Sequence, residues 1–301
     1  MKLKEIIKNP YRPFSFLAMK GLFNWMDDAT YLKLMFRAQF GCNLDLTRPR
    51  RFNEKLQWLK LYDRKPEYVQ MVDKYESKKY FAEVLGSEYI IPNIGVWDSF
   101  DEIDFGYLPE KFVLKTTHDS GGVVICKDKS SFSIENARSV LEKSLKTNYF
   151  NRGREWPYKF VKPRILAEVF LDVKDPKGLV EYKVFCFNGE PKLILLCKGT
   201  AHGLGRTNDF LDIDFNHIPV RATYPNTRER IEKPQQLDEI LDVARKLSVG
   251  ITQLRVDTYV ADGKVYIGEA TFFHDSGWCH LEPQEWDYTF GEMICLPERE
   301  D

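Results

Sequence analysis

The sequence predicts an α+β fold in which β-hairpins are interspersed with amphipathic helices. In residues 255–273, apolar and polar side chains alternate on both sides of an Ala-Asp-Gly turn, which is typical of a β-hairpin. Residues 180–197 contain a second hairpin, around an Asn-Gly turn. Apolar residues at helical spacing in residues 52–62 and a further helical segment at 237–247 complete the pattern.

Length and charge are those of a globular protein. The chain has 301 residues and a formal net charge of −1, so we expect one large domain or two to three lobes around a substantial core. A charge near zero argues against the long-range field of a nucleic-acid-binding protein, although local basic patches are compatible with it.

The cysteines and the N-terminus indicate a cytoplasmic protein. No CxxC or Cys/His zinc spacing occurs, and three of the six cysteines lie in apolar, strand-like runs, so we expect reduced, mostly buried thiols. Lys2 and Lys4 precede no long apolar segment, and no window approaches the roughly 20 apolar residues of a spanning helix. We expect a protein that is neither secreted nor integral to a membrane. The cysteines are Cys42, Cys126, Cys186, Cys197, Cys279 and Cys295.

The first 45 residues mix basic and aromatic side chains, with apolar positions at helical spacing in residues 27–40. They predict a helical cap that packs on the rest of the protein. Because this segment is basic, peripheral contact with an anionic membrane is an alternative role for it.

Residues 73–85 predict a helix that begins at Asp73 as N-cap and ends at Gly86, followed by a short strand at 94–97. Lys74 would lie in the first turn, where the helix dipole disfavours a cation. Such a lysine either points to solvent or is retained to hold an anion.

Residues 111–126 contain two strands joined by the loop THDSGG. Lys115 ends the first strand, directly before the glycines and hydroxyls of the loop. A loop of this kind can bring backbone N–H donors close to a phosphate while the ammonium group supplies charge. Glycine-rich hairpins also occur for structural reasons, and the motif is neither GxxxxGK[ST] nor GxGxxG.

The middle of the chain predicts a helix at 132–147 with Ser133 as N-cap, a basic and aromatic loop, and a strand at 165–171. The strand contains Glu168 among apolar residues, which calls for a defined hydrogen-bonding partner or else a place on a surface edge. After a Lys-Asp-Pro-Lys-Gly turn at 174–178, the hairpin at 180–197 directs Lys183 away from Tyr182. Residues 198–225 are expected to be irregular.

Two carboxylates stand out in the hairpin of residues 255–273. Same-face residues that lie directly opposite on paired strands have Cβ atoms within about 5.5 Å, so Asp257 and Glu269 are expected to converge, with Arg255 nearby. Such a group suits a divalent cation that holds phosphate oxygens. A solvated hairpin face with ordinary charges is the alternative.

Taken in order, these segments resemble the ATP-grasp superfamily and, more narrowly, the TupA-like ATP-grasp family of bacterial polysaccharide and cell-wall gene clusters. The order and spacing are similar to those of D-alanine:D-alanine ligases, which share the superfamily. The resemblance covers about residues 48–290. It is carried by FNEKLQWLKLYD, DKYESKKYF, LPEKFVLKTTHDSGG, REWPYK, ILAEVFL, EYKVFCFNGEPKLI and RVDTYVADGKVYIGEATFF.

The resemblance implies an ATP-grasp fold, in which two α+β lobes with antiparallel sheets clasp the nucleotide. It implies four segments. These are a helical N-terminal extension at 1–47, a helical or αβ segment that precedes the ATP-grasp lobes at 48–110, a small lobe with a glycine-rich lid at 111–167, and a large lobe with the metal-binding hairpin at 168–301.

The resemblance also implies the roles of individual residues, with ATP and Mg²⁺ as cofactors. Arg255 would face the transferring phosphoryl group, with Lys115 as its partner in catalysis. The nucleotide would be held by Lys74, Lys115, the lid residues His118, Ser120, Gly121 and Gly122, the hinge residues Glu168, Val169 and Leu171, and Lys183. Magnesium would be held by Asp257, Glu269 and Thr271. The ligases end this motif with Glu-x-Asn, and Thr271 offers a poorer magnesium ligand than an amide oxygen.

The implied reaction joins a carboxylate, activated as an acyl phosphate, to an amine, and no histidine spacing suggests a catalytic triad or a zinc site. In a polysaccharide setting the carboxylate would be a uronic acid. Our candidates for substrate contact are Arg154, Trp156, Tyr158, Arg206, Ser276 and Gly277. The alternatives are a glycosyltransferase, a sugar kinase and a nucleotide-binding scaffold. Asp212-Ile213-Asp214 matches the DxD motif of metal-dependent glycosyltransferases, but we expect no buried strand before it.

Overall fold

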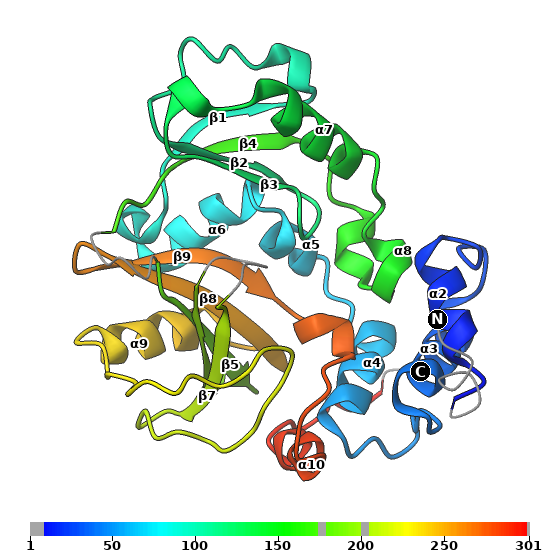
Figure 1. The fold of residues 1–301 in the computed structure, drawn as a ribbon. Helices are drawn as coiled ribbons and strands as arrows, with labels where there is room; N and C mark the ends of the chain where they lie inside the picture. The colour runs from blue at the N-terminus through cyan, green and yellow to red at the C-terminus, as the bar shows by residue number, and fades with distance from the viewer. Residues whose placement is uncertain (1–8, 174–178, 200–204, 300–301) are drawn as a thin grey trace.

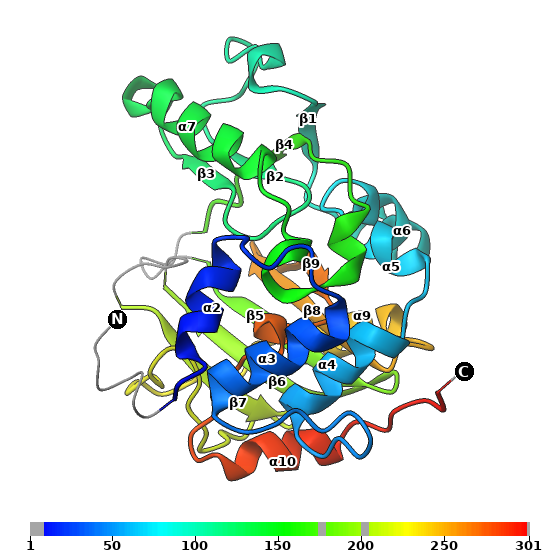
Figure 2. The ribbon, with the colours of Figure 1, turned by 90° about the vertical axis from the view of Figure 1, so that its right-hand side faces the viewer.

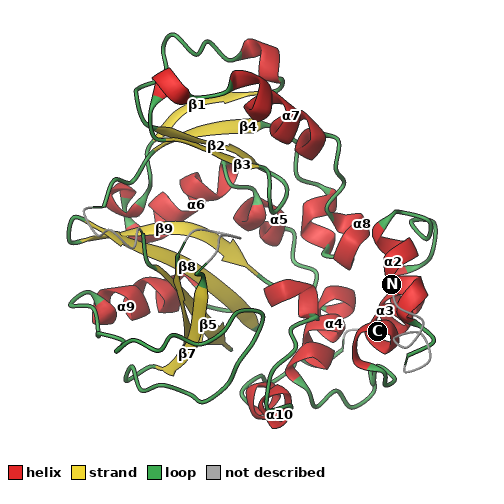
Figure 3. Cartoon of the chain, viewed as in Figure 1, coloured by secondary structure: helices red, strands yellow, loops and turns green. Residues whose placement is uncertain are grey.

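Two antiparallel sheets form the centre of the protein, and helices lie between and around them (Figures 1 and 3). The structure is a computed structural model that describes residues 9–173, 179–199 and 205–299. The predicted turn at 174–178 lies outside this part of the chain. Within it, no helix combines the length and apolar character needed to cross a membrane.

The smaller sheet has four strands in the order β1-β4-β2-β3. Helix α7 (Ile134–Leu145) covers one face and buries Ala137 and Leu141 against Leu114 of the sheet. Its N-cap is Ser133, whose hydroxyl accepts the N–H of Asn136, as predicted. The strands are β1 (Asn93–Trp97), β2 (Phe112–Thr116), β3 (Val123–Cys126) and β4 (Ile165–Val169).

The larger sheet has five strands in the order β7-β6-β5-β8-β9. Helix α9 (Leu237–Leu247) packs on β5, β6 and β8 through an apolar stripe that includes Ile240, Ala244 and Leu247. Both predicted hairpins are present, with positive φ angles at Asn188 and Gly189 in the first turn. The strands are β5 (Glu181–Phe187), β6 (Glu190–Lys198), β7 (Thr207–Asp212), β8 (Gln253–Ala261) and β9 (Lys264–Thr271).

The remaining helices surround these sheets (Figure 2). In the view of Figure 1, α5 and α6 run between the two sheets, while α4 packs on α10 beside the larger one. Gly291 of α10 allows this contact, because a Cβ atom there would lie 2.1 Å from the carbonyl oxygen of Arg50. The helices are α2 (Arg12–Met19), α3 (Asp28–Phe40), α4 (Phe52–Tyr62), α5 (Glu67–Val72), α6 (Glu76–Leu85), α8 (Phe150–Gly153) and α10 (Glu285–Glu292).

Three expectations about the elements were wrong. Strand β7 runs through the segment expected to be irregular. The sequence did not reveal it because its buried residues include the polar pair Asn208 and Asp209, which interrupts the apolar alternation. Helix α6 begins at Glu76, and Asp73 instead accepts the backbone N–H groups of Tyr75 and Glu76 in the turn before it. Helix α8 lies in the expected loop.

The cysteines follow the prediction. Cys126, Cys186 and Cys197 lie on strands of the two sheets, and Cys279 is also buried, whereas Cys295 is exposed. All six have free thiols.

Sheet membership bears on the expected segments. Strand β1 lies within 48–110, the helical or αβ segment expected before the small lobe, and it pairs with β4 in the smaller sheet. We therefore propose that the small lobe begins at β1 instead of at residue 111.

Arg154 anchors the N-terminal helices to the body. Its side chain is 2% exposed, and its guanidinium donates hydrogen bonds to the carbonyl oxygens of Phe23 (2.9 Å), Asn24 (3.4 Å) and Met26 (3.2 Å). The guanidinium carbon also lies 4.2 Å from the ring centroid of Tyr31 in α3. These contacts join the segment between α2 and α3 to the residue that ends α8.

We expect Arg154→Ala to destabilise the protein by about 3 kcal/mol, because three partly buried carbonyl groups lose the guanidinium that donates to them. The thermal midpoint should fall, and limited proteolysis should cut first between α2 and α3. Arg48→Ala, which removes an exposed arginine, is the matched control. Equal behaviour of the two variants would contradict the anchoring role.

Candidate functional site

A row of charged side chains crosses three neighbouring strands of the larger sheet. In the strand register, Lys183 of β5 lies opposite Asp257 of β8, and Asp257 lies opposite Glu269 of β9. The predicted convergence of the two carboxylates is therefore confirmed. Asp257 is fully buried, so the alternative of a solvated hairpin face is wrong.

Arg255 connects the members of this row. Its Nε and Nη2 atoms donate to the two carboxylate oxygens of Asp257 at 2.6 and 2.7 Å. Nη2 also donates to Glu269 Oε1 (3.2 Å) and to the hydroxyl of Thr271 (3.1 Å). One guanidinium thus fixes both carboxylates in position.

Lys183 forms ion pairs with Asp257 and with a carboxylate that the sequence analysis missed. Its Nζ atom contacts Asp257 Oδ2, and it lies 2.9 Å from Glu181 Oε1. Glu181 also accepts the hydroxyl of Tyr259 (3.1 Å). Burial and Arg255 would lower the pKa of Lys183, but Asp257, Glu181 and Glu269 outweigh them and raise it. The alternation of Glu181 and Lys183 on one strand face was the available sequence signal.

The smaller sheet contributes a second group of charges. The carboxylate of Glu168 lies between two ammonium groups, 2.5 Å from Lys115 and 2.6 Å from Lys78. Burial would raise the pKa of Glu168, but the charges of Lys115 and Lys78 lower it. Strand β4 is an inner strand of its sheet, so the surface-edge alternative for Glu168 is wrong.

Lys78 was also missed by the sequence analysis. It lies on α6, four residues after Lys74, and Nζ also donates to the carbonyl oxygen of Ile91 (2.7 Å) and to Asn93 Oδ1 (2.5 Å). Val169 and Leu171, the residues expected to form the hinge, follow Glu168 at and beyond the end of β4.

Lys74 lies against the glycine-containing loop. Its Nζ atom donates to the carbonyl oxygen of Asp119, and its backbone N–H donates to Thr117 O (3.1 Å). The alternative that Lys74 points to solvent is therefore wrong, and its expected place in the first helical turn is corrected to the turn before α6. The sequence thus brings a lysine from the helical segment to the loop that follows Lys115.

The loop is tied down at both ends. The Asp119 carboxylate accepts the hydroxyls of Thr116 and Ser144, and His118 Nε2 lies 3.0 Å from Thr147 O. A Cβ atom on Gly122 would lie 1.9 Å from Thr116 Oγ1. The exposed tip consists of Ser120 and Gly121.

The charges of both sheets act on Glu269. Burial would raise the pKa of this carboxyl, but Lys74, Lys183, Arg255 and Lys115 lower it to about 2. Two of these cations come from the side of the smaller sheet and two from the larger sheet. The site therefore concentrates positive charge around an ionised and partly exposed carboxylate, with 38% of the side chain accessible.

The oxygen atoms of the row suit magnesium. Asp257 and Glu269 supply carboxylates and Thr271 a hydroxyl, and Mg²⁺ prefers oxygen ligands. Glu269 is ionised and accessible, whereas Asp257 is paired with Arg255 and Lys183. Thr271 accepts a hydrogen bond from Arg255 (3.1 Å), so it stays the least suited of the three.

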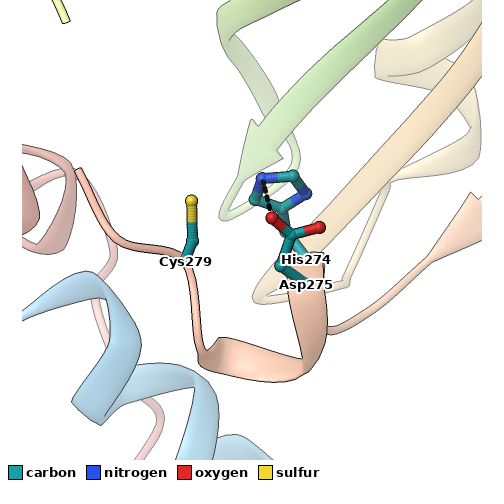
Figure 4. A group of neighbouring side chains, drawn as sticks. All are labelled: His274, Asp275 and Cys279. Atoms are coloured by element: carbon teal, nitrogen blue, oxygen red, sulfur yellow. Dashed lines mark ion pairs between the residues drawn. The ribbon is translucent and has the colours of Figure 1, made fainter. Parts of the chain in front are cut away.

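A second group, His274, Asp275 and Cys279, has potential ligand atoms within 4.8 Å of one another (Figure 4). Arg255 Nη1 lies 2.9 Å from His274 Nδ1. A guanidinium only donates, so Nδ1 accepts and the proton of the neutral ring lies on Nε2. Burial lowers the pKa of His274 to about 4. The ring supports Arg255 and offers no free lone pair to a metal.

Of the expected substrate residues, the structure brings Arg206 to the charged row, and the charge of Glu269 acts on Tyr158. Burial raises the pKa of Tyr158, and the carboxylates of Glu155 and Glu269 raise it further. Arg206 Nη2 lies 3.5 Å from Glu181 Oε2. Arg154 instead anchors the N-terminal helices, and Trp156 is buried against Tyr68, so the structure does not bring either of them to the row.

Ser276 and Gly277 belong to a buried network around Lys60. The Nζ atom of Lys60 donates to the carbonyl oxygens of Gly153 (2.6 Å) and Ser276 (2.7 Å) and to Gln57 Oε1 (2.9 Å). Ser276 Oγ donates to Glu155 Oε1 (2.6 Å). Burial lowers the pKa of Lys60 to about 7. This network holds the segment after β9 against α4 and α8.

The DxD match lies away from these charges, at the end of strand β7 on the edge of the larger sheet. The carboxylate of Asp212 accepts the backbone N–H (2.7 Å) and the side-chain amide (2.9 Å) of Asn216, which closes a turn. The sequence analysis expected no buried strand before this motif, and β7 shows that this was wrong. The motif acts as a turn here.

The sequence matches the family model of the TupA-like ATP-grasp proteins over residues 54–295. Among solved structures it is similar to D-alanine–D-alanine ligases from Bacillus anthracis, complexed with ATP (19% identity, TM-score 0.40, 67% of this chain and 55% of that chain), and Helicobacter pylori (16%, 0.39, 73% and 61%). It is also similar to a RimK-domain ATP-grasp protein from Sphaerobacter thermophilus (10%, 0.42, 77% and 70%).

The chain spans 55% and 61% of the length of those two ligases. No curated protein matches the sequence.

The buried Lys60 predicts a pH dependence of stability. An unfolded lysine has a pKa of about 10.4, so between pH 7 and pH 10 the unfolded chain binds a proton that the folded chain has released. The free energy of unfolding should therefore gain up to about 1.4 kcal/mol per pH unit from this group. Denaturant unfolding across this range should show a smaller slope for Lys60→Met than for the wild type. Lys192→Met, at an exposed position of β6, should keep the wild-type slope, and an unchanged slope in Lys60→Met would contradict the assignment.

Proposed function

The chain belongs to the TupA-like ATP-grasp family, and we propose on that premise that it is an ATP- and Mg²⁺-dependent ligase that joins a carboxylate to an amine. The observation that carries the proposal is the row of Lys183, Asp257 and Glu269 across three strands, in which Arg255 bonds to both carboxylates. Lys74 and Lys115 add positive charge that lowers the pKa of Glu269. A triphosphate needs such a concentration of donors and positive charge. The two sheets supply it from two sides.

The proposed reaction has two steps. In the first, an oxygen of the substrate carboxylate attacks the γ-phosphorus of ATP, and the bond from that phosphorus to the bridging oxygen of ADP breaks. In the second, the amine nitrogen attacks the acyl carbon, the bond from that carbon to the phosphate oxygen breaks, and the nitrogen loses a proton. The products are an amide, ADP and phosphate.

The residues of the site would act by positioning and charge neutralisation. Lys74 and Lys115 would hold phosphate oxygens, with the loop tip at Ser120 and Gly121 above them. Arg255 is held by Asp257, Thr271 and His274, so its guanidinium is fixed before charge develops on the phosphoryl group. None of these steps requires a covalent bond to the protein.

Asp257 and Glu269, with Thr271 as the weakest ligand, would hold magnesium. The ion would neutralise phosphate charge and polarise the phosphorus. Glu269 suits this role because its low pKa keeps it ionised throughout the physiological range.

For the substrate we propose a uronic acid of a surface polysaccharide or its precursor as the carboxylate, and an amino acid or amino sugar as the amine. Arg206 supports this choice, because its guanidinium lies at the border of the charged row and 5.3 Å from the ring centroid of Tyr224. A cation beside an aromatic ring suits a sugar carboxylate.

The proposal predicts which ligands stabilise the folded protein. ATP with Mg²⁺ should raise the thermal midpoint, because a ligand that binds only the folded state stabilises it. Lys115→Ala should abolish this shift, whereas Asp257→Asn and Glu269→Gln should retain part of it and lose ADP release in the presence of uronic acids and amines. Lys192→Met is the control for a lysine outside the site. A shift with UDP-sugars and Mn²⁺ but not with ATP would contradict the proposal in favour of a glycosyltransferase.

A further inference from the structure

The segment from α2 to the start of α3 exposes four large apolar side chains within residues 16–25. Phe16, Met19 and Leu22 are each 54% exposed, and Trp25 is 80% exposed. Soluble surfaces carry single residues of this kind, whereas four within ten residues of one segment make it a candidate contact surface. We call these four side chains the apolar patch.

The apolar patch is held in place from behind. Ala18 of α2 is buried in a cluster with Tyr31 and Leu32 of α3. The rings of Phe14 and Phe23 stack at 4.6 Å within that cluster. The segment is therefore packed against the protein on one side, and the apolar patch lies on its other, outward side.

The charge around the apolar patch is positive. Lys20 is exposed on the same segment, and its Nζ atom lies 4.5 Å from the ring centroid of Phe16. Residues 9–26 contain no aspartate or glutamate. The first acids that follow are engaged, since Asp27 caps α3 and Asp28 pairs with Arg64 at 2.9 Å. Cations beside apolar side chains complement a surface that is anionic outside and apolar within.

A polar hollow of about 240 Å³ borders the apolar patch. It lies between α2 and the segment that precedes and enters α8, which contact each other. Its lining offers ammonium, guanidinium and amide N–H donors, which are the groups that hold a phosphate. The donors belong to Lys20, Asn24, Asn148, Asn151 and Arg152.

We propose that this face docks on a membrane that contains anionic phospholipid, with the apolar patch at the level of the headgroups and a lipid phosphate in the polar hollow. Tryptophan prefers this depth in a bilayer, and Trp25 is the most exposed member of the patch. The inference goes beyond the proposed ligase and does not depend on it. The described part of the chain has no helix that could span a membrane, and docking through this face would bring the enzyme to a lipid surface.

The test is flotation of the full chain with vesicles of phosphatidylcholine, with and without phosphatidylglycerol. We expect the protein to float with the anionic vesicles, and its partition to fall about tenfold or more in Lys20→Glu/Arg152→Glu and in Leu22→Ser/Trp25→Ser. Tyr107→Ser/Val249→Ser, which removes two exposed apolar side chains elsewhere, should float as the wild type does. An unchanged thermal midpoint shows that a variant is folded. If the midpoint of a double variant falls, its two substitutions are tested singly.

Three outcomes overturn the proposal. In the first, the wild type does not float with anionic vesicles. In the second, the wild type and all variants float equally well with neutral and with anionic vesicles. The third is a dimer in light scattering that Leu22→Ser/Trp25→Ser abolishes, because the apolar patch would then bind a second copy of the chain.

Discussion

The candidate site depends on one guanidinium between two carboxylates. Asp257 is fully buried, and a buried carboxylate is costly unless it is paired and hydrogen-bonded. Arg255 contacts both of its oxygens and continues to Glu269 and Thr271, while Lys183 approaches from the neighbouring strand. Removing Arg255 would leave Asp257 beside Glu269 with one cation fewer. The stability of the hairpin and its ability to bind phosphate therefore depend on the same guanidinium.

Strand pairing builds this arrangement. The long-range pairing of β5 with β8 puts Lys183 opposite Asp257, and the hairpin of β8 and β9, with a bulge beside Asp257, puts Asp257 opposite Glu269. Helix α9 packs on β5 and β8. A slip of one residue would turn every charge in the row to the other face. The smaller sheet repeats the principle with one acid between two lysines, and Lys74 and Lys115 bring its charge to Glu269.

The sequence predicted those parts of the fold that depend on local signals. Turn residues and alternation gave both hairpins, and helical spacing gave α4 and α9 with their bounds. Hairpin geometry brings Asp257 and Glu269 near each other, and a bulge between Asp257 and Thr258 places the two carboxylates directly opposite. Strand β7 was missed because its buried polar residues are satisfied by tertiary contacts, such as the N–H of Thr227 on Asp209.

The remaining parts of the site rest on contacts that no spacing encodes. Lys78 reaches Glu168 across ninety positions of the sequence, and Arg154 finds its partners in backbone carbonyl groups 128 to 131 residues away. A basic loop in the sequence therefore suggested substrate contacts where the structure has an anchor. Composition shows that charges are present, but only packing decides which of them face one another.

The central claim is that Asp257 and Glu269 hold the metal ion of a nucleotide. The most direct measurement is an anomalous difference map from crystals grown with Mn²⁺ and a non-hydrolysable ATP analogue. Our account predicts a manganese peak at the carboxylates of Asp257 and Glu269, with the phosphates beside Lys74 and Lys115. A peak at His274, Asp275 and Cys279, or a nucleotide bound away from the two sheets, would contradict it.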